Sequence, residues 1–135
     1  GGQRYHLFTE RMRADLERYA PAPELRAIHG ALLTGLERLE GCTEYLLRAA
    51  ASAPRDVEAA ATPYMQLTGL IAGAWMWLRM AGAANGDSPF AVSKHATARF
   101  YAGHLMPEAG TLELRIRAGA EVLDMLDGET LVSYV

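Results

Sequence analysis

Residues 59–78, AAATPYMQLTGLIAGAWMWL, hold no charged side chain at any of twenty consecutive positions. A helix of that length could cross a bilayer, lie inside a protein core or face a partner surface. The sequence on both sides is amphipathic, because apolar residues recur at helical spacing with charged residues between them. What surrounds this uncharged run therefore decides which kind of fold the chain adopts.

The apolar periodicity predicts four helices, at residues 3–19, 23–51, 54–84 and 89–127. Prolines end the first two, the Asn85–Pro89 loop precedes the fourth, and kinks are expected near Pro63 and Pro107. Long helices joined by short breaks favour antiparallel neighbours. The chain is therefore predicted to be all-α, an up-down-up-down four-helix bundle with long third and fourth helices. Residues 1–128 would form this single domain, and residues 129–135 an extended tail.

The uncharged run is predicted to be buried or interfacial rather than membrane-spanning. Pro63, Gln66 and several alanines contribute little to insertion into lipid, and Arg79 follows the run immediately. The helices on either side have the amphipathic pattern of a bundle in water. We therefore expect no membrane span.

The predicted third helix has two apolar faces. One stripe at helical spacing consists of Tyr64, Leu67, Ile71, Trp75 and Leu78. Trp77 points about 200° around the helix from Trp75, and it forms a second face with Leu70, Gly73 and Ala81. A helix in a simple bundle needs only one apolar face. We expect the second to pack on a second subunit or on the rest of a longer protein, unless Trp77 merely folds over a neighbouring helix end.

Composition excludes some functions and suggests a setting. Thirteen basic and sixteen acidic residues give a net charge of −3, and no basic cluster suits nucleic acid. Cys42 is the single cysteine, so no internal disulfide can form and a cytoplasmic location is expected. The first thirty residues lack a secretory apolar segment. The Gly1-Gly2 start, without an initiator methionine, predicts a processed product or a domain of a longer protein, and we favour the domain.

No motif in the sequence predicts a catalytic, cofactor-binding or metal site in this segment. Neither nucleotide-binding glycine fingerprint occurs. His104 and Glu108 share a helix face but supply only two ligands, so a surface pair is expected. His29 is expected at a bundle edge, and Cys42 as an inert thiol near the buried side of its helix. His6 and His95 are expected in solvent, as is an acidic end formed by Glu121, Asp124 and Asp127.

Two stretches carry a family resemblance: residues 61–84, ATPYMQLTGLIAGAWMWLRMAGAA, and residues 98–127, ARFYAGHLMPEAGTLELRIRAGAEVLDMLD. Together they resemble the extra C-terminal helical domain of bacterial acyl-CoA dehydrogenases, the acetyl-CoA dehydrogenase C-terminal-like domain. Residues 36–50, LERLEGCTEYLLRAA, are compatible with it. The resemblance covers essentially the whole chain, but its distinctive residues are packing residues.

The resemblance implies a parent flavoenzyme. In that family a glutamate removes the α-proton of an acyl-CoA thioester while a hydride passes from the β-carbon to FAD. FAD, the catalytic glutamate and the CoA groove would belong to the parent enzyme, so this segment alone is expected to be inactive. The implied role is structural: packing on the parent acyl-CoA dehydrogenase and on a second subunit.

A rival reading treats the chain as a stand-alone bundle that binds a small apolar ligand. Tyr64, Trp75, Phe100 and Tyr101 could line a cavity between the third and fourth helices. Aromatic residues at helical spacing are more often ordinary core, so the sequence alone leaves both readings open.

Overall fold

The computed structural model describes residues 2–20, 22–126 and 128–133, and within these ranges the chain contains helices and no strand. The long helices are α1 (Gly2–Tyr19), α2 (Arg26–Ser52) and α3 (Pro54–Ala83), with the short 3₁₀ turn η1 (Pro23–Leu25) before α2. Then come α4 (Pro89–Phe100), the π-helical turn η2 (Tyr101–Leu105), α5 (Glu108–Arg117), α6 (Glu121–Asp124) and α7 (Gly128–Ser133). The prediction of an all-helical fold is confirmed.

Local sequence explains where the main helices begin. Pro23 and Pro54 occupy the first turns of η1 and α3, where a missing amide hydrogen costs no helical bond. Ser88 caps α4, because its hydroxyl accepts a hydrogen bond from the amide of Ala91 at 3.2 Å. Pro89 follows in the first turn of the same helix.

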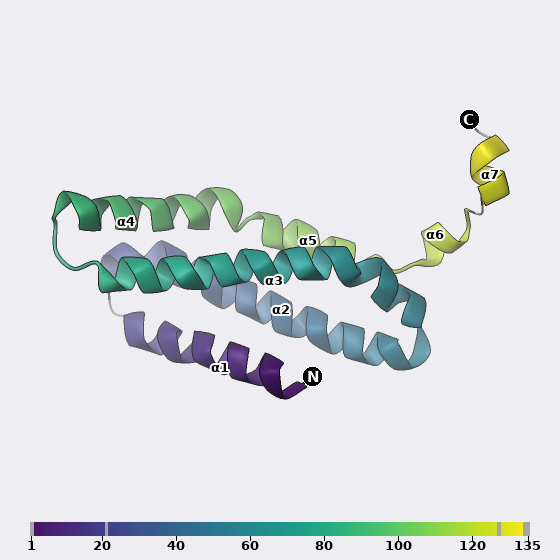
Figure 1. Cartoon of the computed structure of the whole chain (residues 1–135), viewed down its shortest axis with the longest axis horizontal. Coiled ribbons are helices and arrows are strands. Elements are labelled where there is room, and N and C mark those ends of the chain that lie inside the picture. The colour runs from purple at the N-terminus through teal and green to yellow at the C-terminus, as the bar shows by residue number, and fades with distance from the viewer. Residues whose placement is uncertain (1, 21, 127, 134–135) are drawn as a thin grey trace.

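The centre of the fold is the pair α2 and α3, which pack along each other and share neighbours on both flanks (Figure 1). α1 packs against both helices on one flank, while α4, η2 and α5 pack along the other. The largest fully buried side chains lie on α1, α2, α3 and α5: Met12, Ile28, Leu32, Leu36, Leu39, Leu67, Ile71, Leu78, Ile116 and Cys42. One continuous core thus joins these four helices.

The predicted continuous fourth helix is wrong. The π-turn η2 and the turn at Met106–Pro107 separate α4 from α5, and α5 ends at Arg117. Gly119 then has a φ of 76°, a left-handed conformation that glycine adopts readily and that ends the helix. Two helices and a π-turn therefore occupy the place expected for one helix. Asp127 lies outside the described residues.

The predicted extended tail is also wrong within the residues described there. The chain forms α7 over Gly128–Ser133, and the last two residues lie outside the described ranges. In Figure 1, α6 and α7 lead away from the bundle at the end where α3 begins.

The expectation at Pro63 needs a smaller correction. α3 runs through this residue without a break, so no separate leading helix forms. Proline offers no amide hydrogen to the carbonyl four residues earlier, that of Ala59, and this weakens the first turns of the helix. Those turns lean toward the end of α2 in Figure 1.

The uncharged run lies in α3 with one side against the core. Leu67, Ile71 and Leu78 are completely buried, while Tyr64 and Trp75 at the edge of that stripe are half-buried. Throughout the described residues, no helix combines the length and the apolar character that a membrane crossing requires.

Candidate functional site

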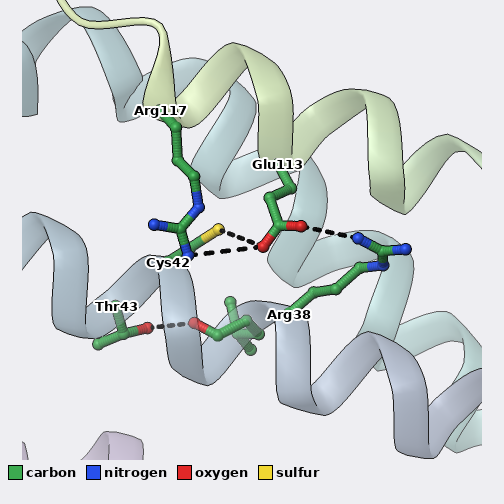
Figure 2. Close-up of polar contacts among 6 residues, drawn as sticks. Arg38, Cys42, Thr43, Glu113 and Arg117 are labelled. Carbon is green, nitrogen blue, oxygen red and sulfur yellow. Dashed lines mark hydrogen bonds and ion pairs between the residues drawn. The ribbon is translucent and has the colours of Figure 1, made fainter.

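A polar cluster between α2 and α5 centres on Glu113 (Figure 2). Its carboxylate accepts a hydrogen bond from Arg38 at 2.7 Å through one oxygen. The other oxygen lies 3.6 Å from the guanidinium of Arg117 and 3.9 Å from the sulfur of Cys42. Glu113 is thereby paired on both oxygens, and the arrangement ties α5 to α2 instead of presenting a free carboxylate to a substrate.

Cys42 at this cluster is suited to packing and not to nucleophilic attack. The thiol is fully buried, and burial raises its pKa above the usual 9.0, with the Glu113 carboxylate adding to the increase. A reactive cysteine needs the opposite: a lowered pKa and access to solvent. The predicted position of Cys42 near the buried side of α2 is confirmed, and its inertness stays a prediction.

A second polar contact lies one residue along α2, at the junction of α1, α2 and α3. The Thr43 hydroxyl donates a hydrogen bond to the carbonyl of Leu39 at 2.8 Å. Because a hydroxyl has a single hydrogen, the Tyr64 hydroxyl is the donor in its own 2.8 Å hydrogen bond with the Thr43 hydroxyl. The nearby Tyr5 hydroxyl is buried and has no hydrogen-bond partner among the described residues. Burial raises the pKa of Tyr5. At this junction the first turns of α1 pack against α2 and α3.

Beyond that junction an apolar groove opens between α2 and α3. It has a volume of about 810 Å³ and is lined by Thr43, Leu46, Leu47, Ala50, Val57, Ala61, Tyr64, Met65, Thr68 and Gly69. Leu47 and Met65 are 70% and 72% exposed. In Figure 1 the described turns of α1 do not reach this part of the α2–α3 pair. We refer to it as the α2–α3 groove.

The predicted docking face on α3 is partly covered by the chain itself. Ala81 is buried, whereas Leu70, Gly73 and Trp77 are half-buried. The Tyr101 ring fills the space above Gly73, and its hydroxyl donates to the carbonyl of Leu70 at 2.7 Å.

Trp77 lies against α4 on this face. The ammonium group of Lys94, on α4, is 5.7 Å from the centre of the Trp77 ring. The alternative placed Trp77 over the end of a neighbouring helix, whereas Lys94 lies within α4. The half-exposed parts of Leu70, Gly73 and Trp77 remain available for contact with another polypeptide. That they dock on one stays a prediction.

The four aromatic residues of the rival reading do not share a cavity. Tyr64 contacts α2, while Trp75 packs edge-on to Phe8 of α1 at 5.6 Å and donates to Asp15 at 2.7 Å. Tyr101 covers Gly73 on the other flank of α3. Phe100 is 55% exposed and stacks on His104 at 4.6 Å. The structure thus separates the residues that sequence spacing suggested could lie together.

Most of the histidines lie as the sequence suggested. His6 is exposed, and His29 donates through Nε2 to the carbonyl of Leu16 at 2.7 Å, as a bundle-edge histidine would. The prediction for His95 is wrong. Its Nε2 lies 3.1 and 3.0 Å from the carbonyls of Ala81 and Ala84, so it donates to the free end of α3.

The remaining sequence candidates are surface groups. Glu108 pairs with Arg115 at 3.7 Å and not with His104. Asp124 is not simply solvated, because it pairs with Arg55 at 2.5 Å. Among the described residues, no three potential metal ligands gather closely enough to hold an ion.

Comparison with known families assigns the chain. The family model described as acetyl-CoA dehydrogenase C-terminal like matches residues 8–126. The chain belongs to the acetyl-CoA dehydrogenase C-terminal-like family. No curated protein matches the chain. The family resemblance inferred from residues 61–84 and 98–127 is therefore confirmed, and the match includes every helix that contributes to the core.

For this acetyl-CoA dehydrogenase C-terminal-like domain, the sequence reasoning found the packing stripes but missed the groove and the Glu113 cluster. The groove depends on how α2 and α3 pack against each other, which no local pattern records. The cluster had a partial signal, because Arg38 and Cys42 lie one helical turn apart, as do Glu113 and Arg117. Nothing in the sequence indicated that these two pairs would meet.

Proposed function

We propose that the chain is the C-terminal structural and assembly domain of an FAD-dependent acyl-CoA dehydrogenase. The single observation that carries this is the family match across residues 8–126. The parent reaction would be α,β-dehydrogenation of an acyl-CoA thioester, with FAD bound by the catalytic body. A cytoplasmic location belongs to the same proposal.

The described part of the chain is consistent with a packing role. Two arginines pair with Glu113, and Cys42 is buried. His29 and His95 donate hydrogen bonds to backbone carbonyls. Glu113 and Cys42 are thus engaged in contacts between α2 and α5, which supports a packing role. The surface, by contrast, keeps uncovered apolar areas, including the α2–α3 groove and the half-exposed Trp77 face. Areas of this kind are typical of contacts with other polypeptides.

The test compares the 135-residue chain with the natural polypeptide that contains it. We expect the 135-residue chain to be helical, colourless and unable to reduce an electron acceptor with any acyl-CoA. The natural polypeptide should bind flavin and carry out the dehydrogenation. Flavin absorbance in the purified 135-residue chain would contradict the assignment of a purely structural role. A natural polypeptide that lacks flavin would contradict the parent enzyme.

A second candidate function is binding of a small apolar ligand. The observation that favours it is the α2–α3 groove, whose lining is almost wholly apolar. A fatty acyl compound that raises the melting temperature of the chain would favour this function. Met65→Glu should abolish that rise, since the side chain lies in the groove and is exposed enough to be replaced without unfolding the domain.

A further inference from the structure

A pocket of about 480 Å³ lies between α4 and the place where η1 leads into α2. α4 packs against both of these elements at this end of the bundle (Figure 1). The pocket is lined by Pro23, Glu24, Arg26, Ala27, Val92, His95, Ala96 and Arg99. The four lining residues of α4 lie on one face of that helix, because they recur at three- and four-residue steps. The pocket shares no lining residue with the α2–α3 groove.

Two arginines line this pocket from different helices, Arg26 from α2 and Arg99 from α4. Both are exposed, and neither forms an ion pair within the part of the chain that the structure describes. Glu24 lines the same pocket without pairing with either arginine. Two arginines against one glutamate leave an excess of one positive charge when His95 is neutral. An anion bound there would interact with both guanidinium groups and offset their mutual repulsion.

The rest of the lining is small and mainly apolar. Pro23, Ala27, Val92 and Ala96 contribute no charged or hydroxyl group. His95 belongs to the wall as well, but its Nε2 already donates to carbonyls at the end of α3. The volume of about 480 Å³ falls within the range of about 300–1,000 Å³ that is usual for small-molecule sites. The pocket therefore has room for an anionic group together with an organic part that contacts the apolar residues.

The number of arginines indicates which anion fits. A guanidinium group binds carboxylate or phosphate oxygens through paired N–H donors. A single arginine is enough for a carboxylate, which has one charge and two oxygens. A phosphomonoester carries a charge of about −1.5 to −2 at pH 7 and has three acceptor oxygens, so two arginines can bind it at the same time. Two unpaired arginines in one pocket therefore favour phosphate over carboxylate.

We propose that this pocket binds a phosphate group, with Arg26 and Arg99 both donating hydrogen bonds to its oxygens. The apolar lining favours a phosphate carried by a small organic molecule over inorganic phosphate, because only the former has a part to place against Val92 and the alanines. This inference goes beyond the assembly role and does not rest on it. Flavin content and dehydrogenase activity of the natural polypeptide test the enzyme assignment separately, whatever binds here.

The first test compares three probes: phenyl phosphate, inorganic phosphate and phenol. Each is titrated at constant ionic strength into the ¹⁵N-labelled 135-residue chain and followed by nuclear magnetic resonance. Phenyl phosphate should give saturable shifts of the side-chain Nε–H signals of Arg26 and Arg99, with a lower dissociation constant than inorganic phosphate. Phenol, which lacks the phosphate, should not shift them. Equal dissociation constants for the two phosphates would assign the pocket to the free ion and overturn the preference for an organic phosphate.

The second test changes the charges of the pocket one at a time. Arg26→Gln and Arg99→Gln should each raise the dissociation constant of phenyl phosphate about tenfold or more, because each removes a hydrogen bond to a charged group. Glu24→Gln should lower it about two- to fivefold, because the carboxylate repels the phosphate. Arg48→Gln is the matched control, since Arg48 is likewise exposed and lies near the opposite end of α2. It should leave binding unchanged.

Several results would overturn the phosphate site. One is the absence of saturable shifts at Arg26 and Arg99 with either phosphate. Another is equal weakening by Arg48→Gln, which would show general attraction to surface arginines. Weaker binding after Glu24→Gln would show that the pocket uses its carboxylate to hold a cationic group instead. Circular dichroism checks that the variants remain folded, as is expected for substitutions of exposed side chains.

Discussion

Gly69 and Gly73 lie one turn apart on α3 but have different surroundings. A side-chain carbon added at Gly73 would overlap the Tyr101 hydroxyl, whereas one added at Gly69 would meet nothing within 4 Å. Gly73 is therefore required for Tyr101 to reach the carbonyl of Leu70, and Gly69 is not required for packing within the chain.

Gly73→Ala should therefore lower the free energy of unfolding by about 1–3 kcal/mol, because the Tyr101 ring must move and lose its hydrogen bond. Gly69→Ala is the matched control. It should raise the free energy of unfolding by about 0.5–1 kcal/mol, since alanine favours the helix more than glycine does. Urea denaturation followed by circular dichroism measures both. Equal effects at the two positions would contradict the contact described at Gly73.

The buried thiol predicts a pH dependence. Burial raises the pKa of Cys42 above 9.0, so the folded chain retains a proton that the unfolded chain has lost. Stability should therefore fall as pH rises above 9.0 toward the native pKa, and it should be unaffected by this group at lower pH. Burial also raises the pKa values of Tyr5 and Tyr101 above 10.0, and these add to the loss at higher pH.

Cys42→Ala should flatten the fall in stability between about pH 8 and pH 10, although the cavity it creates lowers stability at every pH. The measurement is the urea midpoint of both proteins across that range. An unchanged slope in the variant would mean that Cys42 does not titrate as described.

At the scale of the helix, regular spacing made α1, α2 and α3 predictable, because their apolar residues recur with the period of the helix itself. The breaks in the predicted fourth helix were less predictable. Pro107 marked one weak point, but no local signal marked the π-turn at Tyr101–Leu105, whose first residue packs over Gly73 of another helix. Gly119 ends α5 with a positive φ that its sequence neighbours do not dictate.

The start of α4 offers a prediction for a whole helix. Ser88→Ala removes the hydroxyl that accepts from the Ala91 amide, and it should lower the free energy of unfolding by about 1 kcal/mol. Ser93→Ala, inside the same helix, is the control. The Thr97 hydroxyl donates a hydrogen bond to the backbone carbonyl of Ser93, and alanine at position 93 keeps that carbonyl. A loss at Ser93 as large as that at Ser88 would argue against the cap.

For the whole molecule, the sequence anticipated a helical core but not which surfaces would stay open. The stripe of Leu67, Ile71 and Leu78 was identified from spacing and is buried. The Trp77 face was predicted to pack on a second subunit or on the rest of a longer protein, yet α4 and η2 of the same chain partly cover it. The α2–α3 groove was not predicted, because it depends on how α2 and α3 lie side by side after folding.

The shared core predicts that the described helices from α1 to α5 unfold together. Ile71 is fully buried on α3, and it lies close to Gly35 of α2. Ile71→Ala should lower the free energy of unfolding by about 2–5 kcal/mol, because the cavity lies where the main helices meet. Leu114→Ala, on the exposed side of α5, should change it by no more than about 0.5 kcal/mol. Far-ultraviolet circular dichroism and tryptophan fluorescence should give the same midpoint for each protein, since Trp75 and Trp77 pack against the common core. Separate midpoints in Ile71→Ala would show that α1 or α4 can detach while α2 and α3 remain paired.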